Sequence, residues 1–126
     1  MLETRAYLHG SRYYKNPDWF LYNLADLCAR RPQDLQLQRM RDLLLECVRE
    51  RMGCNDNTLG AALRALSAQS LGLQSERDLK ILLDQQQLDG GWELAWLWAY
   101  GTKDVKIGSR GVVTAMAMNA IRRALL

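Results

Sequence analysis

The sequence contains few of the residues that build metal sites and disulfide frameworks. It has one histidine, His9, which excludes a multi-histidine metal site within a single chain. Its three cysteines, Cys28, Cys47 and Cys54, show no CxxC spacing, and three is an odd number. This usage is typical of buried free thiols in a reducing compartment rather than of a disulfide or a metal site. We therefore expect neither a bound metal nor a cofactor.

Long apolar runs and a strong charge imbalance are also missing. No apolar run approaches the roughly 20 residues that a membrane-spanning helix needs, and the first residues lack the apolar core of a signal peptide. These two absences predict a cytoplasmic protein. The formal net charge is +3, and the arginine pairs at 30–31 and 122–123 fall at expected helix ends. Nucleic-acid binding needs a concentrated basic surface, so we do not expect it.

The composition and the spacing of apolar residues predict an all-α fold. A chain of 126 residues suits one domain, residues 1–126. Two prolines and nine glycines argue against low-complexity disorder. Apolar residues recur at three- and four-residue spacing, and almost no segment has the alternation of a strand. We expect residues 1–15 to be irregular or a short helix, and residues 16–126 to form about five helices in antiparallel hairpins.

Local signals predict where these helices begin and end. Asn16 and Pro17 favour a helix start, and Pro32 marks the end of that helix. The second helix is expected over about 34–52, before Gly53. The expected apolar faces are Phe20, Leu24, Leu27 and Cys28 in the first helix, Met40, Leu43, Leu44, Cys47 and Val48 in the second, and Val113, Met116, Ala117, Ala120, Ile121 and Ala124 in the last.

The remaining helices follow the same kind of signal. The third is expected from about residue 56 to Gly72. Ser75 and Asp78 resemble a capping box that opens the fourth helix, and Gly90 and Gly91 break it. A tryptophan-rich connector and a loop over 101–108 then lead to the last helix, from about residue 109 to the end of the sequence.

An internal similarity links the third and last helices. The run at 62–66, ALRAL, matches the run at 117–121, AMNAI, and a threonine precedes each one, Thr58 and Thr114. The offset of the two runs, 55 residues, is about the length of one long helical hairpin with its connectors. Such a period is typical of stacked helical repeats, in which each unit buries a face against its neighbour.

The string at 86–92, QQLDGGW, resembles the QW motif of terpenoid cyclases and protein prenyltransferases. Arg77 and Leu82 also fall where the longer motif has a basic and an aliphatic residue, whereas Asp78 and Ile81 depart from it. The resemblance covers roughly residues 56–126 and implies part of an αα-toroid, a ring of antiparallel helical hairpins. In that family the motif is a structural element and not the catalytic site.

Physical chemistry gives the same interpretation of the motif. Asp89, Gly90 and Gly91 favour the end of a helix, since glycine reaches left-handed dihedrals at little cost. The amide of Gln86 is long enough to satisfy backbone groups left without partners there. Trp92 can cover the turn with a large ring whose indole N–H needs an acceptor. We therefore expect these residues to hold one hairpin against the next.

Catalytic motifs of the related enzymes are missing from the sequence. It contains no DxDD string for protonating an alkene and no DDxxD string for holding magnesium against a diphosphate. Its single histidine does not suit the zinc site of a protein prenyltransferase. The resemblance implies that a complete toroid has about six hairpins. This chain is long enough for two to three of them. No catalytic residue is therefore expected.

Candidate ligand-binding residues lie in the connector and at the start of the last helix. Trp96, Trp98 and Tyr100 could hold a prenyl chain, and Lys106 and Arg110 could bind its diphosphate. The alternative, which the sequence favours, is that the aromatic residues pack the connector and the charges are ordinary surface groups.

Two functions follow from these observations. The first is a module of a terpenoid-cyclase-like or prenyltransferase-like toroid that helps bind an isoprenoid diphosphate, completed by other toroid segments or by self-association. The second is a non-catalytic helical module that binds other proteins through an uncovered face.

Overall fold

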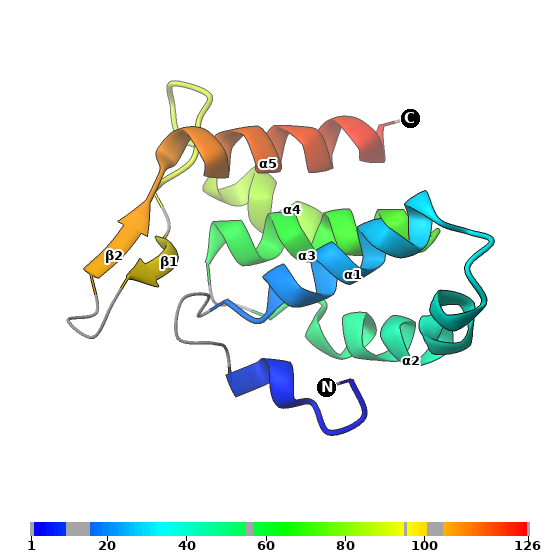
Figure 1. Cartoon of the computed structure of the whole chain (residues 1–126). Coiled ribbons are helices and arrows are strands. Elements are labelled where there is room, and N and C mark those ends of the chain that lie inside the picture. The colour runs from blue at the N-terminus through cyan, green and yellow to red at the C-terminus, as the bar shows by residue number, and fades with distance from the viewer. Residues whose placement is uncertain (1, 10–15, 55–56, 95, 101–104, 126) are drawn as a thin grey trace.

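The computed structural model describes residues 2–9, 16–54, 57–94, 96–100 and 105–125. Helices dominate these residues, so the all-α prediction is confirmed (Figure 1). The elements in chain order are the 3₁₀ helix η1 (Ala6–His9), α1 (Asp18–Arg30), α2 (Leu35–Arg51), α3 (Thr58–Ser70), α4 (Glu76–Gln85), the strands β1 (Trp96–Tyr100) and β2 (Val105–Gly108), and α5 (Arg110–Ala124).

The helices alternate in direction along the chain. In Figure 1, α1, α3 and α5 run the same general way, and α2 and α4 return between them. α3 packs against all four of the other α-helices. Its residues 58–68 are all buried, and most of them are small or apolar. Glycine and alanine let neighbouring helices approach closely, which explains how one helix is surrounded on every side.

Two hydrophobic clusters fill the interior, and α3 contributes to both. One joins Leu59, Leu63 and Leu66 of α3 to α4, α5 and Trp92. The other lies between α1 and α2 and is covered by the N-terminal segment, from which Leu2 and Tyr7 are buried. No helix in the described part of the chain is long and apolar enough to cross a membrane.

Most of the expected helix boundaries are confirmed. Asp34, Asn57 and Ser109 each accept a hydrogen bond from a backbone N–H in the first turn of the helix that follows. Gly53 and Gly72 have positive φ angles of 77° and 80° just after their helices, a conformation that glycine adopts without strain.

Two details of the prediction were wrong. Ser75 is the N-cap residue of α4, but its hydroxyl donates to the Asp78 carboxylate at 2.5 Å and makes no cap bond to the backbone. The end of α4 agrees with the prediction, because the helix ends at Gln85 and Gly90 lies in the turn that follows. The buried apolar residues of α1 are Leu21, Ala25 and Cys28, whereas Leu27 is 39% exposed. The buried face of α1 is rotated relative to the expected face, because α1 packs against both α2 and α3.

The tryptophan-rich connector also differs from its prediction. It contains an antiparallel pair of short strands, β1 and β2, which pair Trp98 with Ile107 and Tyr100 with Val105. Tryptophan, tyrosine and valine favour strands. An irregularity between Trp96 and Trp98 shifts the register.

Candidate functional site

The residues of the QW-like motif form a tight turn between the end of α4 and the chain leading to β1. The side-chain amide of Gln86 donates to the Gly90 carbonyl at 2.8 Å. The backbone N–H of Gln87 donates to the Gly91 carbonyl, and that of Gly90 donates to the Gln87 carbonyl. Gly90 has a φ of 88°, which favours glycine at this position. Gln86 therefore stabilises the turn rather than the last carbonyls of the helix.

Trp92, instead of Gln86, provides a hydrogen-bond donor for a backbone carbonyl at the end of α4. Its side chain is 1% exposed, and its indole N–H donates to the Leu82 carbonyl at 2.7 Å. Leu82 lies in the last turn of α4, where carbonyls have no partner within the helix. The backbone N–H of Trp92 donates to the hydroxyl of Thr114 on α5 at 3.1 Å. One residue thus connects α4 to α5.

Asp89 links the same turn to the first residue of α5. Its carboxylate accepts a hydrogen bond from the Gly91 N–H at 3.0 Å and forms an ion pair with the Arg110 guanidinium at 2.6 Å. Arg110 also donates to the side-chain oxygen of Gln87 at 2.8 Å. The Gly91 N–H, followed by the Arg110 guanidinium, lowers the pKa of Asp89 below its ordinary value.

The absence of a side chain at Gly91 leaves room for Arg110. A Cβ atom at this position would lie 2.6 Å from a guanidinium nitrogen of Arg110 and 3.2 Å from the hydroxyl oxygen of Thr114. A larger residue would therefore displace Arg110 from Asp89.

The lowered pKa of Asp89 predicts a pH-dependent stability. The carboxylate form is stabilised in the folded state, so its contribution is present above its ordinary pKa of 3.8 and is lost as the pH falls through the lowered folded value. We expect Asp89→Asn to have a lower melting temperature than the wild type near neutral pH, with a gap that closes in acid. Melting curves of both proteins between neutral pH and about pH 3 test this; a gap of constant size would contradict it.

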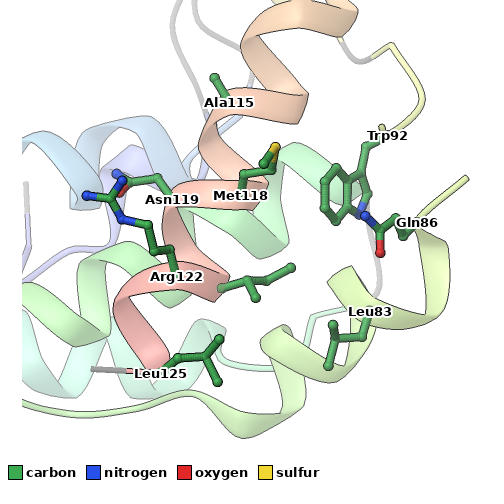
Figure 2. A pocket seen from close by; sticks show the side chains of 9 residues that line it. Leu83, Gln86, Trp92, Ala115, Met118, Asn119, Arg122 and Leu125 are labelled. Atoms are coloured by element: carbon green, nitrogen blue, oxygen red, sulfur yellow. The ribbon is translucent and has the colours of Figure 1, made fainter. Parts of the chain in front are cut away.

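An apolar pocket lies between α4 and α5, beside the motif. Its volume is about 500 Å³. In Figure 2, Trp92, Gln86 and Leu83 line one side, Met118 faces them from α5, and Asn119 and Arg122 lie beyond Met118. Leu83, Met118 and Leu125 are 58%, 56% and 83% exposed, so the pocket is open to solvent. It is lined by Leu83, Gln86, Trp92, Ala115, Met118, Asn119, Ile121, Arg122 and Leu125.

The structure places the predicted ligand-binding residues only in part. Trp96, Trp98 and Tyr100 lie on β1 and Lys106 lies on β2, but their side chains fall outside what the structure describes. Arg110 is described, and its guanidinium is engaged by Asp89 and Gln87. Among the described residues there is no group of three or more histidine, cysteine, aspartate or glutamate side chains that could hold a metal ion.

A buried charged network, which the sequence interpretation missed, lies at the centre of the fold. Arg64 of α3 is 1% exposed and pairs with Asp18 of α1 and Asp78 of α4, each at 2.9 Å. It also donates to the Cys54 carbonyl at 2.6 Å. Arg51 of α2 makes a bidentate pair with Asp18, at 3.1 and 3.0 Å.

Two signals in the sequence could have revealed this network. Arg64 interrupts a run of small and apolar residues, ALRAL, and a charge at the centre of such a run needs a buried partner. Asp78 stands where the QW-like motif usually has a small residue. This difference from the motif has a structural reason, because Asp78 accepts hydrogen bonds from Arg64, Ser75 and the Gly53 N–H.

Comparison with known proteins links the sequence of this chain to part of one enzyme. No protein-family model matches the chain, and no solved structure matches it. The chain is 37% identical over 122 residues to the drimenol cyclase drtB of Aspergillus calidoustus, an alignment that covers 96% of this chain and 23% of the relative. The chain therefore spans about a quarter of the length of that curated relative. Over nearly all of its length, it is homologous to a segment of a terpenoid cyclase.

Proposed function

We propose that the chain is a structural segment of a terpenoid-cyclase-like αα-toroid, and that it helps enclose an isoprenoid diphosphate without supplying the catalytic acid. The observation that carries this proposal is the 37% identity to part of a drimenol cyclase across 96% of the chain. The alternation of α1, α3 and α5 with the returning helices α2 and α4 supports it, because stacked hairpins have this order.

The buried carboxylates do not suit the role of an acid. A group that protonates a substrate must reach it. Asp18 and Asp78 are both 0% exposed, and their oxygens accept hydrogen bonds from Arg64 and other groups. On the proposed function, the acid is supplied by another part of the assembly.

The strand pair carries the residues proposed to bind the substrate. Trp96, Trp98 and Tyr100 lie on β1, and Lys106 lies on β2, where it pairs with Ala99. Aromatic faces hold apolar prenyl chains and stabilise cations, and an amine attracts a diphosphate. We infer that this strand pair, with Lys106 as the cation, contacts the isoprenoid. Arg110 would have to exchange Asp89 for the diphosphate to take part.

The test measures the solution mass by light scattering at several protein concentrations, together with the melting temperature, with and without farnesyl and geranylgeranyl diphosphate. We expect the diphosphates to raise the melting temperature and to favour a larger assembly. Lys106→Ala should weaken the apparent affinity by about tenfold. Lys80→Ala, which removes an exposed amine paired with Asp84, is the matched control. A monomer indifferent to both ligands would argue against substrate binding by this chain alone.

A second candidate is a non-catalytic helical module that binds another protein. The exposed leucine and methionine side chains beside the pocket favour it, since contiguous apolar surface marks interaction sites. On this alternative the chain associates without any response to isoprenoid diphosphates, and the same light-scattering experiment separates the two.

A further inference from the structure

We propose that the groove between α4 and α5 is the docking site of an amphipathic helix that packs antiparallel to α5, supplied by another segment of a cyclase-like polypeptide. This rests on the proposed function, because it names the partner that completes the segment. The groove is the pocket lined by Leu83, Met118 and Leu125.

The internal repeat indicates what covers this surface. At the 55-residue offset, Leu63 and Leu66 of α3 correspond to Met118 and Ile121 of α5. The two leucines are 0% exposed and belong to the cluster that α4 completes, whereas Met118 is 56% exposed. The Leu63 position is therefore covered by a helix in α3, whereas its counterpart Met118 in α5 is open and Ile121 is partly buried against the core.

The order of the helices indicates the direction of the docked helix. α1 is followed by α2 and α3 by α4, and each second helix returns antiparallel to the first. Within the described residues α5 has no such return helix. A helix placed in the groove would contact both α5, through Met118, and α4, through Leu83.

The expected chemistry of the partner helix follows from α4, because α4 covers the equivalent face of α3. α4 has an apolar face that includes Leu79 and Leu82 and an acidic residue, Asp78, which pairs with Arg64. At the repeat offset Arg64 corresponds to Asn119, which lines the groove together with Arg122. We therefore expect the partner helix to carry apolar residues at three- and four-residue spacing and an acidic residue facing Asn119 and Arg122.

The relative is long enough to contain such a helix outside the matched segment. The matched segment is 23% of the length of the drimenol cyclase, so most of that protein lies outside it. A second copy of this chain is the competing occupant.

The test uses a peptide copy of α4 as the probe. A fluorescein-labelled peptide of residues 74–87 is titrated with the full chain and followed by fluorescence anisotropy. We expect saturable binding with a dissociation constant tighter than about 1 mM, weakened about tenfold or more by Met118→Asp. Leu35→Asp, at a leucine of α2 that is 67% exposed and outside the groove, is the matched control and should leave the affinity within about twofold. Circular dichroism verifies that both variants fold.

Three results would overturn the proposal: no saturable binding, equal weakening by both substitutions, or a concentration-dependent dimer that Met118→Asp dissociates while the peptide fails to bind. The last result would assign the groove to a second copy. Failure of isoprenoid binding is a separate result, because the peptide titration contains no diphosphate and depends only on the groove.

Discussion

Replacing Arg64 with methionine is expected to lower the free energy of unfolding by about 3–5 kcal/mol, enough to unfold much of a marginally stable domain. The substitution leaves two fully buried carboxylates without their shared cation. Asp18 keeps Arg51 as a partner, and Asp78 keeps hydrogen bonds from Ser75 and from the Gly53 N–H. Urea unfolding at neutral pH, followed by circular dichroism, measures the loss.

An exposed arginine provides the control for this measurement. Arg30 pairs with Asp26 one helical turn away, and its side chain is 76% exposed. Arg30→Met should cost no more than about 0.5 kcal/mol, because solvent screens such a pair. Adding Asp78→Asn to Arg64→Met should recover part of the loss, since it removes one of the uncompensated charges. Equal effects of the two methionine substitutions would contradict the role assigned to the buried network.

Trp92→Ala is expected to lower the free energy of unfolding by about 3–5 kcal/mol, because it opens a cavity in a close-packed core. The side chain is 1% exposed and packs with the α3, α4 and α5 cluster. Trp92→Phe should cost less, about 1–3 kcal/mol, mainly because the Leu82 carbonyl loses its indole donor. Urea unfolding of the two variants gives both numbers.

A control substitution in the same turn distinguishes the effect of burying the indole ring from the effect of the turn geometry. Leu88 is fully exposed, so Leu88→Ala should leave the free energy of unfolding within about 0.5 kcal/mol of the wild type. A large effect at Leu88 together with a small one at Trp92 would show that turn geometry, and not burial of the indole ring, stabilises the contact between α4 and α5.

The helices were predictable because their signals are local. A cap such as Asn57 acts on a backbone N–H three residues away, so the sequence around it contains the whole interaction. The buried face of α1 was less predictable: Cys28 was expected there, but Leu21 and Ala25 are selected by contacts with helices that come later in the chain. The strand pair was missed for a related reason: five residues of β1 are too few for a clear alternation, and their pairing depends on β2.

The candidate site likewise contains local features that the sequence predicts and long-range contacts that it does not. The turn at 86–92 was recognisable from its glycines and tryptophan, and its structural character follows from bonds within a few residues. The partners of Asp89 and Trp92 on α5, Arg110 and Thr114, lie about 22 residues away, and no spacing rule links them. The pairing of Arg64 with Asp18 joins residues 46 positions apart, so only the folded chain reveals it.

The order of the charged residues along the chain has a consequence for synthesis on the ribosome. Asp18 and Arg51 pair directly, and both belong to the first hairpin, α1 and α2. Arg64 follows when Asp18 is already present, and Asp78 follows when Arg64 is already present. Because domains emerge from the N-terminal end, each new charge of the network finds an opposite charge among the residues already made. A nascent chain that stops after α2 therefore already contains Arg51 as a partner for the Asp18 carboxylate before α3 is made.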